Sequence, residues 1–494
     1  MHVILAAALA IGVWLVPAVV AAADAFQLDL VARRIRLMDG LGDQSIFVLF
    51  SAPVQVYSHD IDYEYRQDSD LYYLTGIPQP DTVLVLMPGN ESRRELLFIS
   101  PPDPDREHRD GHRLTPAEAE SISGIRSVYF STEFEPFVEA AFAGRSYDSA
   151  RHGPTSQFGP FFRALADGRA ELSLVLDVPA TLDGPIDETR AFGNRVVSRF
   201  DGIFVRDAGP SLARLRRVKS AFERDQLTRS VAISVDAHLA GMRVARPGAY
   251  EYEVEAAIEH VFLSRGALGG SYPSIVGSGP NATILHYQKS RRRMAAGELL
   301  LVDAAASHEY MTGDITRTYP VSGTFSLDQR ALYEIVLAAQ DAAIAAIVPG
   351  VTPNELCEKT VQVVAAGLFR LGLITDATGD EYRQWYTHGC FHYVGLDVHD
   401  VGSTDEPLEP GVAFVIEPGI YIRPEALDHL PNTAGYERFA ARVRPAVERY
   451  AGIGIRIEDS FLLTETSVER LSAGVPRTID EIEHFLAAAA SGAR

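Results

Sequence analysis

Four carboxylates and one histidine in the second half of the chain constrain this sequence more than any other feature. Each lies in a short segment with its own pattern, and the five residues are Asp303, Asp314, His392, Glu417 and Glu458. Burying four carboxylates together without cations would cost a great deal of free energy. Two divalent ions would balance the four negative charges. The pattern therefore predicts a two-metal site with a hydrolytic reaction.

Asp303 and Asp314 flank a predicted hairpin. If the hairpin closes through two residues at His308–Glu309, the two aspartates face each other across its strands. Like charges opposite one another destabilise a sheet, and a metal pair would explain them. The alternative is that they are ordinary aspartates beside a turn.

A second strand is predicted in the segment GIGIRIED. Arg456 and Glu458 share one of its faces, while Ile455 and Ile457 point to the other. If the isoleucines face the core, the charged pair faces a cavity or solvent. An exposed amphipathic strand would give the same pattern.

Three histidines, His388, His392 and His399, fall close together in the segment THGCFHYVGLDVHD. The first two have HxxxH spacing, but no Glu follows His388, so a zincin HExxH site is excluded. The chain also contains no GxSxG elbow, no P-loop and no paired CxxC motif. These absences remove the main competing hydrolase chemistries.

Length and charge set the outer bounds. A chain of 494 residues predicts two domains, and its net charge of −21 argues against nucleic acid as a partner. An uncharged apolar run over 3–23 ends in small residues, which predicts a signal peptide over 1–23 and an exported protein, periplasmic or secreted. The run is long enough to span a bilayer, so an uncleaved membrane anchor is the alternative.

The chain has only two cysteines, Cys357 and Cys390, so no disulfide framework is predicted. They could pair in an oxidising compartment. Two separate buried thiols are the favoured interpretation.

The pattern of strands and helices divides the remaining chain in two. Over 24–208, apolar runs such as SIFVLF, DLYYLTG, DTVLVLM, ELLFIS and ELSLVLD read as strands and alternate with helices such as TPAEAESISG, which predicts an α/β domain. Over 209–494, one long helix from about Leu212 to Pro247 is followed by helices near 252–266, 327–348 and 353–372. Strands are grouped around them, which predicts an α+β domain.

The segments SYPSIVGSGPNATILHY, LLVDAAASHEYMTGDITRTYPVSGTF, HGCFHYVGLDVHDVG, FVIEPGIYI and GIGIRIEDSFLLT resemble, in order and spacing, the pita-bread metallopeptidase family, most closely its Xaa-Pro aminopeptidase (aminopeptidase P) branch. The segment YRQDSDLYYLTGIPQPDTVLVLM resembles that branch's non-catalytic N-terminal domain. The resemblance implies a pita-bread catalytic domain with a dinuclear site. In it Asp303 would chelate one metal, Asp314 and Glu458 would bridge both, and His392 and Glu417 would complete the coordination of the other metal.

The resemblance also implies the reaction: removal of the N-terminal residue from peptides with proline in second place, by attack of a metal-bridging hydroxide. The metals are expected to be Mn²⁺, with Co²⁺ or Zn²⁺ as substitutes. Glu417 would also shuttle a proton, and His286 and His388 would hold the substrate and stabilise the tetrahedral intermediate. His399 resembles the family's further histidine that lines the pocket. Arg456 would orient a ligand carboxylate.

Several alternatives stay open. A prolidase of the same fold shares all five ligands but cleaves only dipeptides, and a creatinase-like enzyme or a non-catalytic binding module would be expected to lack ligands. A homo-oligomer, dimer or tetramer, is expected by analogy alone. The stretch from Arg423 to Tyr450 is longer than the family's usual link; a solvated insertion is favoured there over a lid or an oligomer contact.

Overall fold

The computed structural model describes residues 25–145, 158–176, 184 and 186–492. The predicted signal peptide lies outside these residues. The chain divides into two compact units, 1–216 and 217–494, whereas the sequence pattern placed the boundary after residue 208. Within the described residues, no helix has the length and apolar character needed to cross a bilayer.

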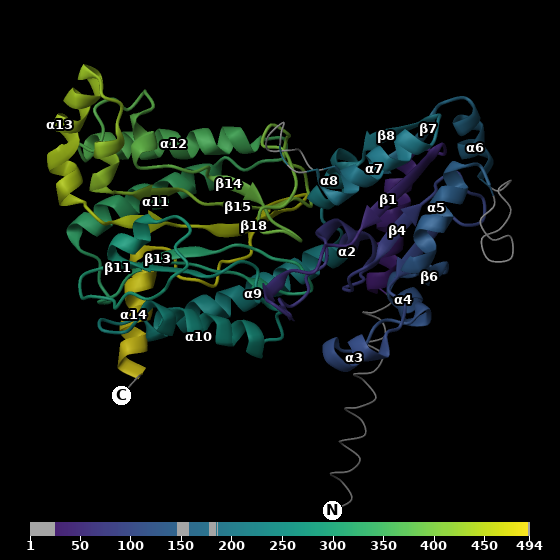
Figure 1. Ribbon diagram of the computed structural model, residues 1–494. Helices are drawn as coiled ribbons and strands as arrows, with labels where there is room; N and C mark the ends of the chain where they lie inside the picture. Colours follow the sequence, from purple (N-terminus) through teal and green to yellow (C-terminus); the bar gives the residue numbers. More distant parts are fainter. Residues whose placement is uncertain (1–24, 146–157, 177–183, 185, 493–494) are drawn as a thin grey trace, which may run out of the picture. The chain divides into compact units, whose positions relative to one another are not determined.

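The first unit is built on a six-stranded mixed sheet with the order β6-β5-β4-β1-β7-β8 (Figure 1). Strand β1 pairs with β4 antiparallel and with β7 parallel. The central strands of the sheet, β1 and β4, are buried along nearly their whole length, as their continuous apolar runs require. The strands are β1 Ser45–Phe50, β4 Val83–Leu86, β5 Glu95–Ile99, β6 Val128–Phe130, β7 Ala170–Leu174 and β8 Ile203–Asp207.

Helices α5 Phe134–Phe142, α6 Gly159–Ala166 and α7 Glu188–Arg199 contribute aromatic side chains to one core cluster with this sheet. The remaining helices of the unit are α2 Ser69–Thr75, α3 Pro104–Asp110, α4 Pro116–Ser123 and α8 Gly209–Arg217, preceded by a helix over 25–41. The predicted α/β character of this domain is confirmed. The predicted helix TPAEAESISG is α4, opened by a capping box of Thr115 and Glu118.

One predicted strand of this unit is wrong. The segment DLYYLTG forms helix α2, which begins after the cap Asp68 and ends at Gly76 in the left-handed region. Because the helix is buried on nearly all sides, its apolar run has no helical period, and such a run does not distinguish a strand from a buried helix.

The second unit combines small antiparallel sheets with long helices, which confirms its α+β character. Its main sheets have the orders β10-β11-β13 and β14-β15-β18-β19, and two-stranded pairs are formed by β16 with β17 and by β12 with β9. The strands are β9 Gly269–Gly270, β10 Ile275–Ser278, β11 Leu299–Asp303, β12 Ala306–Ser307, β13 Thr316–Pro320, β14 Phe391–Tyr393, β15 Ala413–Ile416, β16 Gly419–Tyr421, β17 Gly454–Arg456, β18 Asp459–Leu463 and β19 Val468–Arg470.

Helices α9 and α10 pack against each other, as do α11 and α12. Their bounds are α9 Ala221–Val244, α10 Glu251–Ser264, α11 Leu327–Ala345 and α12 Pro353–Arg370, and the chain continues to α14 Ile479–Gly492. The long helix predicted from Leu212 is two helices, α8 and α9. Ser220 caps the start of α9 in a capping box with Glu223. The new helix therefore begins there, and the apolar spacing that predicted one continuous helix runs across a break between α8 and α9.

The stretch from Arg423 to Tyr450 folds into a short 3₁₀ helix, η5 Pro424–His429, and helix α13 Ala434–Arg449. Helix α13 buries Phe439, Val443 and Val447 on one face. The stretch is therefore an ordered part of the second unit, with an apolar face of its own.

Candidate active site

The predicted hairpin exists, but its register differs from the prediction. His308 bridges Met311, so the closing residues are Glu309 and Tyr310, both with positive φ. Asp303 consequently lies opposite Thr316 rather than Asp314. The sequence hid this turn because the primed turns that close such hairpins usually contain Gly or Asn. The two aspartates still converge, since the Tyr272 hydroxyl contacts the carboxylates of both.

Five strands place the site residues in one row. The backbone of Asp303 pairs with that of Thr316, and Thr316 forms an antiparallel β-bridge with Glu458. Ile416 pairs with Asp459, so the next pair in this antiparallel register is Glu417 with Glu458. The Glu417 N–H donates to the carbonyl of Cys390 at 2.8 Å. The backbone thus brings residues that are up to 155 positions apart in the sequence side by side.

Three of the predicted ligands form a compact donor cluster. Ligand atoms of Asp314, His392 and Glu458 all lie within 4.8 Å of one another. His392 Nε2 is 3.4 Å from Glu458 Oε1 and 3.7 Å from Asp314 Oδ2. Glu417 Oε1 lies 3.8 Å from the same nitrogen, and Asp303 joins the group through Tyr272. The structure therefore brings all five predicted residues together.

The donor set fits divalent cations. Within the described residues, Glu458 Oε1 is buried and forms no hydrogen bond, although His392 Nε2 lies 3.4 Å away, and a buried carboxylate oxygen of this kind favours a bound cation. Carboxylates with one imidazole are ligands that suit divalent first-row metals.

The electrostatics of the cluster lead to the same conclusion. Burial, with the charge of Glu458, raises the pKa of Glu417 to about 8. Burial and the charges of Glu458 and Asp303 raise the pKa of Asp314 well above its usual range. Burial would lower the pKa of His392, but Glu458 and Glu417 outweigh it and raise that pKa to about 9. The protein alone holds too much negative charge here, and bound cations would relieve it.

Arg456 supplies one fixed positive charge. It donates to Asp303 Oδ2 at 2.5 Å, to the Tyr421 hydroxyl at 2.9 Å and to Thr316 Oγ1 at 3.1 Å. Thr316 in turn donates to Glu458 Oε2 at 2.7 Å. Burial works to raise the pKa of Asp303, but Arg456 and the bond from Tyr272 keep it below its usual range. As predicted, Arg456 and Glu458 face the site, while Ile455 and Ile457 are buried.

The predicted histidines lie around this centre. His388 has Nδ1 2.7 Å from the Gly389 carbonyl and Nε2 2.8 Å from the Tyr421 hydroxyl. Because a carbonyl only accepts, Nδ1 carries the hydrogen and Nε2 accepts from Tyr421. Burial and the charge of Arg456 lower the pKa of His388 to about 3, so the ring is neutral.

The remaining two histidines are exposed. The rings of His399 and His392 are 4.3 Å apart between centroids. Burial of part of the ring lowers the pKa of His399, and the charges of His392 and His286 add to this effect. His286 therefore lies near His399, at the accessible side of the site.

Sequence reasoning missed Tyr272, Tyr421 and Thr316. Each contacts a predicted residue through a hydroxyl, and each lies within or beside a segment already singled out. The feature that could have identified Tyr421 is its place on strand β16, which pairs with strand β17, the strand that carries Arg456. Hydroxyl residues are too common in strands for that signal to be recognised without the register.

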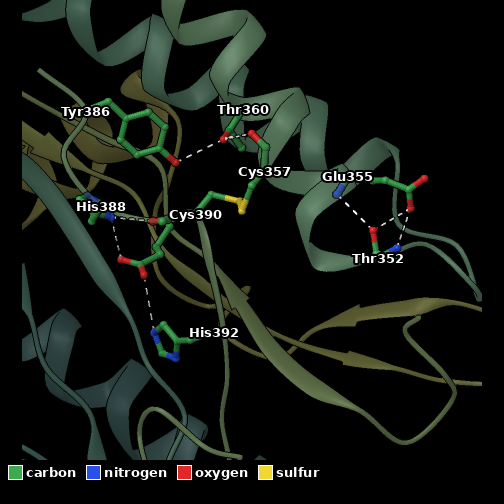
Figure 2. The surroundings of a disulfide bond; sticks show 10 residues. Thr352, Glu355, Cys357, Thr360, Tyr386, His388, Cys390 and His392 are labelled. Carbon is green, nitrogen blue, oxygen red and sulfur yellow. Dashed lines mark hydrogen bonds and ion pairs between the residues drawn. A yellow bond between two sulfur atoms is a disulfide. The ribbon is translucent and has the colours of Figure 1, made fainter. Parts of the chain in front are cut away.

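The two cysteines are bonded to each other, so the favoured prediction of separate thiols is wrong. Cys357 on α12 and Cys390 just before β14 have their Cα atoms 5.3 Å apart, a separation typical of disulfides (Figure 2). The sequence could not place α12 beside β14, because 33 residues separate the two cysteines.

Comparison with known proteins covers almost the whole chain. Residues 225–465 match the model of metallopeptidase family M24, and residues 30–148 match that of the aminopeptidase P N-terminal domain. The Xaa-Pro aminopeptidase of Haemophilus influenzae is 33% identical over 465 residues, which cover 92% of this chain and 96% of the relative.

Two solved structures are also similar. The aminopeptidase PepP of Pseudomonas aeruginosa has a TM-score of 0.77 and 33% identity, covering 94% of this chain and 99% of that one. A zinc-substituted Escherichia coli aminopeptidase P in complex with product has a TM-score of 0.76 and 30% identity, covering 94% and 98%.

Proposed function

The chain belongs to metallopeptidase family M24 and is a metal-dependent Xaa-Pro aminopeptidase, and we propose that Asp303, Asp314, His392, Glu417 and Glu458 hold its metal ions. The observation that carries this assignment is the cluster of Asp314, His392 and Glu458, with one buried carboxylate oxygen that forms no hydrogen bond in the described part of the chain. Bound divalent ions supply Lewis-acid chemistry: they polarise a carbonyl and make water acidic enough to attack it near neutral pH.

The other residues position the substrate and move protons. Hydrolysis of an X–Pro bond must deliver a proton to the proline nitrogen, which has no hydrogen of its own in the peptide. Glu417, whose carboxylate lies between His388 and His392, takes the proton from the attacking water and gives it to that nitrogen. Arg456 donates to Tyr421, and Tyr421 to His388. These two hydrogen bonds fix the orientation of the His388 ring. His388, together with His286 and His399, then contacts the peptide and the developing oxyanion.

The metal, compartment and assembly complete the proposal. Mn²⁺ suits a set of four carboxylates and one imidazole, and zinc occupies the substituted Escherichia coli relative.

Export is supported by the apolar run over 3–23 and by the disulfide, since structural disulfides persist mainly in oxidising compartments. Self-association is supported by a hairpin of β2 Val56–Ser58 and β3 Ile61–Asp62, which exposes four apolar side chains, namely Val56, Tyr57, Ile61 and Tyr63.

A peptide panel tests the reaction. We expect purified enzyme with Mn²⁺ to release the first residue from a free-amine Xaa-Pro-Yaa peptide. The matched Xaa-Ala-Yaa and N-acetylated Xaa-Pro-Yaa peptides should stay intact, which mass spectrometry measures directly. Cleavage of Xaa-Pro dipeptides alone would establish a prolidase instead. Undiminished cleavage of the acetylated peptide would exclude an exopeptidase.

Metal removal tests the cofactor. Dialysis against EDTA should abolish cleavage of the Xaa-Pro-Yaa peptide, and added Mn²⁺ should restore it, because the buried carboxylates need cations. The same chelator saturated beforehand with Mn²⁺ is the control for side effects. Full activity in protein shown by elemental analysis to be free of divalent metal would refute a metal-dependent mechanism.

A further inference from the structure

The disulfide lies next to the proposed site. Cys390 is two residues from His388 and two from His392, and its side chain is fully buried. Cys357 lies on α12 and is partly exposed. Figure 2 shows the bond joining the helix to the segment that carries both histidines.

Cys390 is the last residue in the row of paired backbone positions that runs from Asp303 through Thr316, Glu458 and Glu417. Its carbonyl accepts the Glu417 N–H at 2.8 Å, and Glu417 is followed in the register by Glu458. A displacement of Cys390 would therefore move one acceptor that fixes Glu417 and the strand that bears His392. Glu417 and His392 are both proposed metal ligands, and Glu417 Oε1 lies 3.8 Å from His392 Nε2.

Helix α12 makes a second contact with the site one turn further along. The Thr360 hydroxyl is 3.2 Å from the Tyr386 hydroxyl, and the Tyr386 ring packs edge-on against His388 with centroids 5.4 Å apart (Figure 2). This contact is a single hydrogen bond between hydroxyls, whereas the disulfide is covalent. The disulfide is thus the stronger restraint between α12 and the site.

We propose that Cys357 is a positioning residue for the peptidase reaction: through its bond to Cys390 it fixes Glu417 and His392, and the oxidised enzyme is the fully active form. The inference rests on the proposed function of the site. It makes activity depend on the redox state of one disulfide, although neither sulfur touches the substrate.

The disulfide can be reduced through its less buried end. A reductant attacks the sulfur of Cys357, the less buried of the two cysteines, and Cys390 leaves as the thiolate and takes up a proton. With a trialkylphosphine the overall balance is one disulfide, one phosphine and one water giving two thiols and one phosphine oxide. A phosphine is preferable to a dithiol for the test, because dithiols also bind divalent metals.

The experiment compares the oxidised enzyme, the phosphine-treated enzyme and Cys357→Ala, with Glu358→Ala as the matched control at an exposed position of α12. Steady-state kinetics on an Xaa-Pro-Yaa peptide and calorimetric titration of metal-depleted protein with Mn²⁺ are the two readouts. We expect kcat and Mn²⁺ affinity each to fall about tenfold on reduction and in Cys357→Ala, with KM changed less than about twofold. Phosphine should not lower the activity of Cys357→Ala further, and Glu358→Ala should match the wild type.

Two results would overturn the inference. One is a reduced enzyme and a Cys357→Ala variant that both keep the wild-type kcat and Mn²⁺ affinity. The other is loss of the circular dichroism signal together with activity on reduction, which would assign the bond to global stability. If the oxidised enzyme cleaved no peptide at all, the proposed function would fail, while the Mn²⁺ titration would still decide whether the disulfide positions the ligands.

Discussion

Glu458→Gln is expected to lower kcat/KM on an Xaa-Pro-Yaa peptide by about a thousandfold or more, because several kcal/mol of metal-dependent transition-state stabilisation would be lost. The substitution keeps the shape of the side chain and an oxygen that can accept from Thr316. It removes the negative charge from the centre of the donor cluster, where Oε1 forms no hydrogen bond with any residue that the structure describes. Metal retained after dialysis should fall as well.

The control for this prediction is Glu469→Gln on the neighbouring strand β19, where the side chain is exposed. Peptide kinetics and elemental analysis on both variants separate a local effect from a general loss of charge. A Glu458→Gln enzyme with wild-type metal content and kcat would remove Glu458 from the ligand set.

Arg456→Met is expected to cost the metal-free protein about 3–5 kcal/mol of unfolding free energy, the usual result of removing one partner of a buried ion pair. The side chain of Arg456 is 5% exposed and that of Asp303 is 10% exposed. Methionine fills most of the space but leaves the Asp303 carboxylate and the Tyr421 hydroxyl without their donor. Denaturant unfolding followed by circular dichroism measures the change.

Arg449→Met is the matched comparison. Arg449 pairs with Asp328 on the surface, where water and salt screen the interaction, so its loss should hardly change stability. A similar small effect for both variants would mean that Arg456 is not a stabilising counter-charge. Addition of Mn²⁺ should restore part of the stability of Arg456→Met, because bound cations also compensate Asp303.

The sequence predicted what depended on residue type and on short-range alternation. Four carboxylates with one histidine were sufficient to predict a metal site, and the alternation of Arg456 and Glu458 with two isoleucines predicted which face meets it. Helices α10, α11 and α12 were predicted near 252–266, 327–348 and 353–372 and are present. The carboxylates and the histidine were recognised by residue type within short segments, and the other signals are each contained within a few turns or a single strand.

What the sequence could not predict depended on tertiary contacts. The turn at Glu309–Tyr310 has no Gly or Asn to reveal its position, so the predicted turn at His308–Glu309 was one residue too early. Helix α2 is buried on almost every side and has lost the polar face that would identify it. The Cys357–Cys390 bond needs α12 to lie beside β14, a contact that no local pattern encodes.

The row of paired residues from Asp303 through Thr316, Glu458 and Glu417 to Cys390 also determines when the enzyme can first act. Its members are spread between Asp303 and Glu458, so the pairings beyond the hairpin join strands that lie far apart in the sequence of the second unit. A partly folded chain therefore has no complete donor set. Hydrolytic capacity is therefore a property of the folded second unit as a whole and not of any single segment of it.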